Sequence, residues 1–254
     1  MHFIMDDHDR KLERMYLAAR NGWLLITVLV TAGAGIATAG RAVGSHIALE
    51  FREAERSYVR YVPAGLGELP PVLVLLHGSG RDGSTMIAEW RKLADAEGIL
   101  LVAPNSANPE EWSPYDDTPA FLRAVLDDVG RTVAFDRTRV YLFGHSAGAV
   151  WGLQLGLLAS DEVAAVAVHA GLIPEVAHPL IAQATRKVPF YLQVGSRDPF
   201  FPIEEVKRTV GALDEAGFAV DLEVIRSHDH DYYARSKKVN QAAWAFLRQH
   251  RIER

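Results

Sequence analysis

Apolar segments of strand length alternate with amphipathic segments of helix length from about residue 46 onward, and this alternation constrains the fold most. Continuous apolar runs such as Pro71–Leu76 are typical of strands buried on both faces of a sheet. The predicted strands are 46–54, 56–65, 71–76, 99–105, 139–144, 163–171, 188–195 and 219–225, and the predicted helices are 84–98, 116–133, 146–160, 203–217 and 232–250. This order predicts an α/β fold with a mostly parallel central sheet flanked by helices. We expect Ser84 to cap the first helix and Gly98 to end it.

Composition narrows the class of protein and of partner. The 254 residues are 49% hydrophobic and 23% charged, which is ordinary for a globular chain. The formal net charge of −5, without long runs of one sign, argues against nucleic acid or an anionic membrane surface as a partner. The chain has no cysteine, which excludes disulfides, thiolate catalysis and cysteine–metal sites.

The N-terminal segment 1–39 departs from the globular pattern. Residues 23–39 are uncharged and end in Ala37-Thr38-Ala39, the form that signal peptidase recognises. We therefore expect a leader that is cleaved near Ala39, and a secreted or periplasmic mature protein. A translation start at Met15 in place of Met1 would remove the acidic residues that precede the apolar run. The alternatives are a membrane anchor over residues 23–39 and an ordinary buried helix.

A serine lies between two glycines where a predicted buried strand meets a predicted helix. The motif is Gly144-His145-Ser146-Ala147-Gly148, with the spacing G-x-S-x-G. Such a turn is sharp, it strains the backbone of the serine, and its glycines leave room for the crossing segments. The helix N-terminus behind Ser146 favours developing negative charge. The motif indicates a nucleophilic serine, and the alternative is a simple tight turn.

A serine nucleophile needs a histidine base that is held by a carboxylate. On this kind of sheet the three residues follow one another in the order serine, carboxylate, histidine. Asp198 follows one predicted strand, and His228 and His230 follow the next, so all of them lie on loops at one edge of the sheet. We favour Asp198 and His230, because the aromatic residues after His230 would anchor its loop.

Other assignments of these residues remain open. Asp198 could be a plain turn residue, His228 could be the base, and the H-x-H pair could bind a metal, although no third ligand is obvious nearby. Three further carboxylates are less suitably placed, and three further histidines suit packing or loop-shaping roles. These residues are Asp229, Asp231 and Glu175, and His77, His145 and His169.

Acyl transfer also needs two N–H donors for the oxygen anion of its tetrahedral intermediate. One donor is the N–H of Ala147, which follows the nucleophile. The second is expected from the glycine-containing loop His77-Gly78-Ser79-Gly80, which follows a buried strand. We predict that Ser79 N–H is this second donor. The alternative is a glycine turn without function.

Five segments together resemble the α/β-hydrolase fold family: LLHGSGRDGSTM, LADAEGILLVAPNS, RVYLFGHSAGAVWGLQL, VGSRDPFFP and HDHDYYA. Within that family the chain is similar to small esterases of the polyhydroxybutyrate depolymerase-like, feruloyl esterase-like and phospholipase/carboxylesterase-like groups. The last segment is similar to an esterase D-like pattern, which also favours His230. The sequence shows no internal repeat and no low-complexity linker, so we expect a single catalytic domain over residues 46–254. Only 172–187 separate two predicted strands where related lipases carry a cap, so we expect no cap domain.

The sequence therefore predicts a serine ester hydrolase of the carboxylesterase type, with the triad Ser146, Asp198 and His230. We expect a small-molecule or polymer ester as the substrate, no cofactor or metal, no nucleic acid, and membrane contact only through the leader. A peptidase or an acyltransferase with the same triad is the alternative, and a non-catalytic binding protein on the same fold is another. Four aromatic residues on predicted loops are candidates for either the substrate site or packing: Trp112, Tyr115, Phe200 and Phe201.

Overall fold

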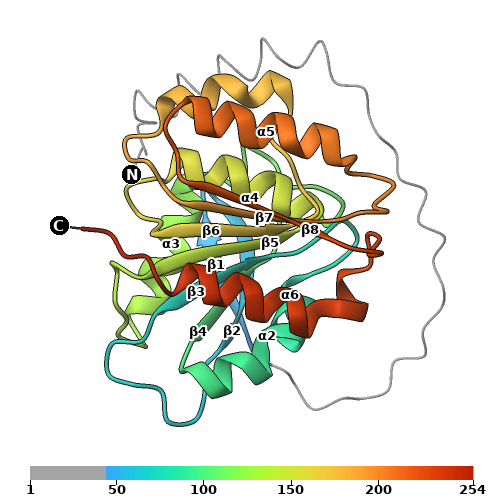
Figure 1. The fold of residues 1–254 in the computed structure, drawn as a ribbon. Coiled ribbons are helices and arrows are strands. Elements are labelled where there is room, and N and C mark those ends of the chain that lie inside the picture. The colour runs from blue at the N-terminus through green and yellow to red at the C-terminus, as the bar shows by residue number, and fades with distance from the viewer. Residues whose placement is uncertain (1–43, 254) are drawn as a thin grey trace. The chain divides into compact units, whose positions relative to one another are not determined.

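Eight strands form one sheet in the computed structural model, which describes residues 44–253 (Figure 1). The strand order is β1-β2-β4-β3-β5-β6-β7-β8. Strand β2 is antiparallel to both β1 and β4, and all other neighbours are parallel. The strands are β1 (Ser45–Phe51), β2 (Ala54–Tyr61), β3 (Val72–Leu76), β4 (Leu100–Pro104), β5 (Val140–His145), β6 (Ala165–His169), β7 (Phe190–Gly195) and β8 (Val220–Ile225). The mostly parallel sheet that the alternating pattern predicts is confirmed.

Helices cover both faces of this sheet. They are α2 (Gly83–Glu97), α3 (Pro119–Gly130), α4 (Ala147–Leu158), α5 (Ile203–Glu215) and α6 (Tyr232–Leu247). Helices α2 and α6 lie together on one face, and α3, α4 and α5 lie on the other (Figure 1). Because both faces are covered, the central strands β3, β4, β5 and β6 are buried along their whole length.

The start of α2 differs from the prediction. Asp82, and not Ser84, is the N-cap: its side chain accepts a hydrogen bond from Thr85 N–H at 3.0 Å. Asp82 directly precedes the first helical residue, Gly83, so its carboxylate can accept from the free N–H groups of the first turn. Ser84 is already a helical residue, and its hydroxyl contacts His46. The predicted end is confirmed, because Gly98 adopts the left-handed conformation with φ 68°.

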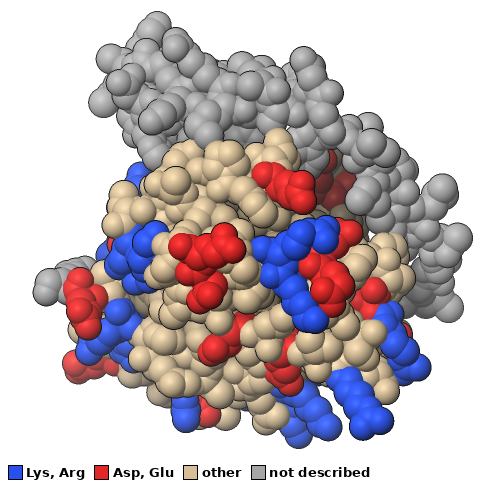
Figure 2. Space-filling model, turned by 45° about the horizontal axis from the view of Figure 1, so that its top comes forward, with Lys and Arg blue, Asp and Glu red and all other residues tan. Residues whose placement is uncertain are grey.

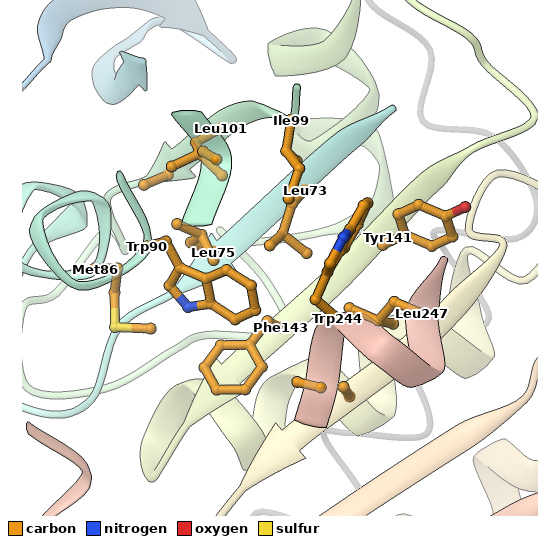
Figure 3. Packing of buried hydrophobic residues seen from close by; sticks show 14 of the residues in the cluster. Leu73, Leu75, Met86, Trp90, Ile99, Leu101, Tyr141, Phe143, Trp244 and Leu247 are labelled. Carbon is orange, nitrogen blue, oxygen red and sulfur yellow. The ribbon is translucent and has the colours of Figure 1, made fainter. Parts of the chain in front are cut away.

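The core between the sheet and helices α2 and α6 is built from alternate residues of the strands (Figure 3). Phe143 of β5 meets Trp90 of α2 edge to face, with ring centroids 4.9 Å apart. Tyr141, two residues earlier on β5, meets Trp244 of α6 in the same way at 5.7 Å. This packing against one face of β5 fixes the strand that leads into the G-x-S-x-G motif.

The connection from β6 to β7 contains one short element, the 3₁₀ helix η1 (Glu175–Gln183). No cap domain is inserted there, as the length of this connection predicts. Within residues 44–253, no helix combines the length and the hydrophobicity that a membrane span requires. The predicted leader, with its cleavage site near Ala39, lies outside the described residues.

Candidate active site

Ser146 occupies the single residue between β5 and α4. Strand β5 ends at His145 and α4 begins at Ala147, so the chain reverses direction at the serine. Ser146 has φ 55° and ψ −119°, a conformation that residues with a side chain rarely adopt. The N–H of Ser146 donates to the carbonyl of His169 at 3.1 Å. This sharp turn holds the hydroxyl group at the carboxyl edge of the sheet.

The two glycines of the motif allow this crossing. A Cβ atom on Gly144 would lie 2.1 Å from the carbonyl oxygen of Gly148. A Cβ atom on Gly148 would lie 2.2 Å from the carbonyl oxygen of Leu76, in β3. Because both neighbours are backbone atoms, which cannot move aside, a side chain at either position is incompatible with the turn.

Ser146, His230 and Asp198 form a continuous hydrogen-bonded series. The Oγ atom of Ser146 lies 3.0 Å from Nε2 of His230. The Nδ1 atom of the same ring lies 2.9 Å from Oδ2 of Asp198. The Asp198 carboxylate is fully buried, and the His230 side chain is 23% exposed. The structure therefore brings together the three residues of the predicted triad.

The carboxylate fixes the protonation of this series. A carboxylate only accepts hydrogen bonds, so Nδ1 of His230 carries the ring proton and Nε2 is free to accept the proton of the Ser146 hydroxyl. Burial opposes the ionisation of Asp198. The hydrogen bonds from His230 and from two backbone N–H groups outweigh burial and lower the pKa of Asp198 below its usual value.

Asp198 also shapes its own loop. Its Oδ1 atom accepts hydrogen bonds from the N–H groups of Phe200 and Phe201 at 2.9 and 3.1 Å. The sequence left a turn residue and a triad member as alternatives for Asp198. The geometry combines both, because one carboxylate oxygen holds the turn and the other faces His230.

The predicted oxyanion loop lies directly against the serine. A Cβ atom on Gly78 would be only 3.4 Å from Cβ of Ser146. Within residues 44–253, the N–H groups of Ser79 and Ala147 donate no hydrogen bond. Ala147 is the first residue of α4, where N–H groups lack partners within the helix. Two free N–H donors are thus available from the two residues that the sequence indicates, Ala147 next to Ser146 and Ser79 in the loop packed against it.

Side chains outside the motif hold the oxyanion loop. The Ser79 hydroxyl donates to the carbonyl of Glu110 at 2.6 Å. His77 uses both ring nitrogens: Nδ1 donates to the carbonyl of Gly78 at 2.9 Å, and Nε2 accepts from Ser106 N–H at 3.2 Å. Burial lowers the pKa of His77, which keeps the ring neutral. His77 thus shapes the loop, as predicted.

Trp112 and Glu110 contact the oxyanion loop, and the sequence does not predict these contacts. The Trp112 indole donates to the carbonyl of His77 at 2.8 Å, and its ring packs on the His77 ring. Trp112 therefore supports the oxyanion loop. The contacts of Trp112 and Glu110 join residues more than 30 positions apart, and no local motif announces them. These contacts follow from the pairing of β3 with β4, because the loops after two neighbouring parallel strands lie side by side.

Phe200 and Phe201 flank the ring of His230. The Phe201 ring stacks on it at 5.7 Å with an interplanar angle of 13°. The Phe200 ring meets it edge to face at 4.9 Å and is 49% exposed. The exposed Phe200 ring therefore presents an apolar surface beside His230.

The other carboxylates that the sequence offered are engaged elsewhere. Asp231 caps α6 by accepting from Ala234 N–H, and Asp229 accepts from the N–H of Asp231. Glu175 belongs to η1 and lies 3.8 Å from Arg208. Within the described part of the chain, no cluster of three or more histidine and acidic side chains could hold a metal ion.

His228, the alternative base, lies away from the serine. Its Nε2 atom is 2.9 Å from Nε2 of His169, and its side chain is 2% exposed. Burial is the main cause that lowers the pKa of His228. The His228 ring thus makes a buried hydrogen bond with His169, whereas the His230 ring makes the hydrogen bond with Ser146.

Comparison with known proteins supports this fold assignment. The model of the Alpha/beta hydrolase family matches residues 73–253. A relative from Nocardia uniformis subsp. tsuyamanensis, the protein NocK, carries the name of an esterase and is 31% identical over 163 residues. The alignment covers 59% of this chain and 47% of the relative. The chain therefore spans about half the length of this relative.

Solved structures share the fold at low sequence identity. An S-formylglutathione hydrolase from Agrobacterium tumefaciens has a TM-score of 0.65 at 17% identity, covering 84% of this chain and 98% of that one. An acylaminoacyl peptidase from Pyrococcus horikoshii has a TM-score of 0.63 at 16% identity, covering 81% of this chain and 40% of that one. Likeness at this level of identity establishes the fold alone.

Proposed function

The chain belongs to the Alpha/beta hydrolase family, and on that premise we propose that it is a serine hydrolase that cleaves carboxylic ester bonds. The proposal rests on one observation: the hydrogen-bonded series from Ser146 through His230 to Asp198. Nucleophile, base and orienting carboxylate are the groups that acyl transfer through a serine requires.

In the first half of the proposed reaction, Ser146 Oγ attacks the carbonyl carbon of the ester. Nε2 of His230 takes the hydroxyl proton and then gives it to the oxygen of the leaving alcohol. Asp198 stabilises the imidazolium that forms in between. The alcohol leaves, and the acyl group remains bound to Ser146 as an ester.

In the second half, a water molecule attacks the acyl-enzyme. His230 takes a proton from the water and returns it to Ser146 Oγ as the carboxylic acid departs. Both tetrahedral intermediates carry a negative oxygen, which the N–H groups of Ser79 and Ala147 stabilise. The positive end of the α4 dipole adds to this stabilisation. Every step uses groups of the chain and water, so the reaction needs no cofactor.

Two observations favour an ester on a small molecule or a polymer. The relative from Nocardia carries the name of an esterase, and no cap domain within residues 44–253 encloses the carboxyl edge of the sheet. On the face shown in Figure 2, basic and acidic side chains are interspersed, so this face carries no patch of positive charge of the kind that binds nucleic acid.

A peptidase with the same triad is the main alternative. The fold does not discriminate between the two, because an acylaminoacyl peptidase shares it. Rates on a p-nitrophenyl ester and a p-nitroanilide of the same acyl group separate them. We expect hydrolysis of the ester with little or no hydrolysis of the anilide.

The proposal is tested by hydrolysis of p-nitrophenyl butyrate. We expect activity in the wild-type protein and loss of at least about a thousandfold in Ser146→Ala. Ser84→Ala is the matched control. This serine lies in α2, outside the proposed site, and its hydroxyl contacts the exposed His46. Equal activity in wild type and Ser146→Ala would refute the assignment.

We also propose, from the sequence, that residues 1–39 are a leader and that residues 46–254 form one catalytic domain. The support is the uncharged run 23–39 with its Ala37-Thr38-Ala39 ending. N-terminal sequencing of the protein made in its native host tests this proposal. A mature chain that begins at residue 40 supports it, and a chain that retains Met1 overturns it.

A further inference from the structure

Three buried histidines form a hydrogen-bonded chain beneath the proposed base. His145 Nδ1 lies 3.1 Å from His169 Nδ1, and His169 Nε2 lies 2.9 Å from His228 Nε2. The three residues are at most 5% exposed. They come from the end of β5, the end of β6 and the loop between β8 and α6. The proposed reaction uses none of these three rings to move a proton.

The contacts fix the tautomer of each ring. His145 Nδ1 also lies 3.4 Å from the carbonyl oxygen of His169, which can only accept, so His145 Nδ1 carries a proton. His169 Nδ1 then accepts, and the neutral His169 ring carries its proton on Nε2 and donates to His228. His228 in turn carries its proton on Nδ1. Burial lowers the pKa of all three rings, which keeps them neutral, and the two hydrogen bonds between them run in the same direction, from His145 to His169 and from His169 to His228.

The three histidines contact Ser146, His230 and the residue that precedes Asp198. The carbonyl of His169 accepts from the N–H of the nucleophile, Ser146, at 3.1 Å. The ring of His145 lies 5.0 Å from the ring of the base, His230. The carbonyl of His228 accepts from the N–H of Arg197, next to Asp198, at 2.8 Å.

His228 joins the loop of the base to the loop of the orienting carboxylate. The Arg197 guanidinium donates to the carbonyl of Ser227 at 2.7 Å, and the N–H of Ser227 donates to the hydroxyl of Ser196 at 2.9 Å. A Cβ atom on Gly195 would lie 2.4 Å from the carbonyl oxygen of His228, so the two loops pack backbone on backbone. The His228 ring is the side chain that ties this pair of loops to β6.

We propose that His228 and His169 are positioning residues, whose hydrogen bond holds the β8–α6 loop so that His230 lies between Asp198 and Ser146. This inference rests on the proposed function. Loss of the bond frees the loop two residues before His230 and leaves a buried N–H of His169 without an acceptor. A shift of the base by a fraction of an ångström to 1 Å lowers the rate of the chemical step without removing contacts to substrate.

The test compares His228→Leu with His228→Gln on p-nitrophenyl butyrate. Leu removes the acceptor of the His169 N–H, whereas the side-chain oxygen of Gln restores one. We expect Leu to lower kcat by about tenfold or more with KM within about twofold, and Gln to recover most of kcat. His46→Leu, at an exposed position on β1, controls for the loss of a histidine.

The outcomes separate this inference from the proposed function. An inactive wild-type protein refutes the proposed function. An active wild type with unchanged kcat in His228→Leu, or with the same loss of kcat in His228→Leu and His228→Gln, overturns the inference alone.

Nitrogen-15 NMR of the wild-type imidazoles supplies a measurement that needs no variant to fold. We expect protonated Nδ1 in His145 and His228 and protonated Nε2 in His169. A proton on Nε2 of His228 would overturn the arrangement.

Discussion

Ser146 Oγ and His230 Nε2 lie 3.0 Å apart although 84 residues separate them in the chain. They meet because β5 and β8 are parallel members of one sheet, and the loops after parallel strands lie at the same edge. The distance suits transfer of the hydroxyl proton to the ring. The orientation of the His230 ring depends on its other nitrogen, Nδ1, which lies 2.9 Å from Oδ2 of Asp198.

Asp198→Asn should lower kcat for ester hydrolysis by about a thousandfold or more while the fold persists. The amide oxygen can still accept from the N–H groups of Phe200 and Phe201. The amide N–H, however, favours the His230 tautomer whose Nε2 carries a proton and cannot act as a base. Steady-state kinetics with a thermal unfolding control measure the effect. Asp221→Asn, an exposed change on β8, should leave kcat unaltered, and equal kinetics in both variants would contradict the role of Asp198.

The glycines of the nucleophile turn give a prediction on stability. Gly148→Ala should lower the free energy of unfolding by more than about 3 kcal/mol or prevent folding, because its Cβ would lie 2.2 Å from a backbone oxygen. Gly211→Ala is the matched control, because this glycine is also helical and no atom outside its chain neighbours and the local helix backbone lies within 4 Å of its Cβ position. That change should stabilise the protein by about 0.5–1 kcal/mol. Urea unfolding of both variants checks the pair, and a well-folded Gly148→Ala protein would contradict the tight crossing.

The triad residues could be predicted because each follows a recognisable pattern. Ser146 lies in a motif with fixed spacing, and Asp198 and His230 follow strands whose apolar runs are clear in the sequence. The choice between His230 and His228 rested on weaker local signals. The structure distinguishes the two rings: Nε2 of His230 lies 3.0 Å from Oγ of Ser146, whereas Nε2 of His228 lies 2.9 Å from Nε2 of His169.

Other features depend on contacts between distant segments, which no local pattern contains. The Arg56 guanidinium pairs with the Asp117 carboxylate and lies over the Phe121 ring, and these contacts anchor the segment that follows Trp112. The predicted N-cap of α2 is wrong, because aspartate and serine are both common N-cap residues and the sequence does not distinguish Asp82 from Ser84. The histidine chain joins three strand ends, and single histidines in a sequence do not reveal such pairing.

The buried histidines predict how stability depends on pH. Burial, followed by the neighbouring histidines, lowers the pKa of His145 to about 3 and of His169 to about 2. These values are below the value of 6.5 for an unfolded histidine, so under mildly acidic conditions the unfolded chain binds protons that the folded chain does not. The free energy of unfolding should therefore fall as the pH decreases below about 6.5, by up to about 1.4 kcal/mol per pH unit for each such histidine.

Urea unfolding between pH 7.5 and 5, above the range where most carboxylates titrate, measures this slope. His169→Gln removes one of these groups and should give a shallower slope. A slope that is the same in His169→Gln and wild type, or stability that increases as the pH falls through this range, would be inconsistent with a buried neutral chain.

The most direct test of the central claim is covalent labelling by a fluorophosphonate, which reacts with an activated serine hydroxyl, followed by peptide mapping with mass spectrometry. The proposed triad predicts one phosphonyl group per chain, attached to Ser146, and no labelling of Ser146→Ala. A wild-type protein that stays unlabelled, or a label on a different serine, would contradict the claim that Ser146 is a nucleophile activated by His230.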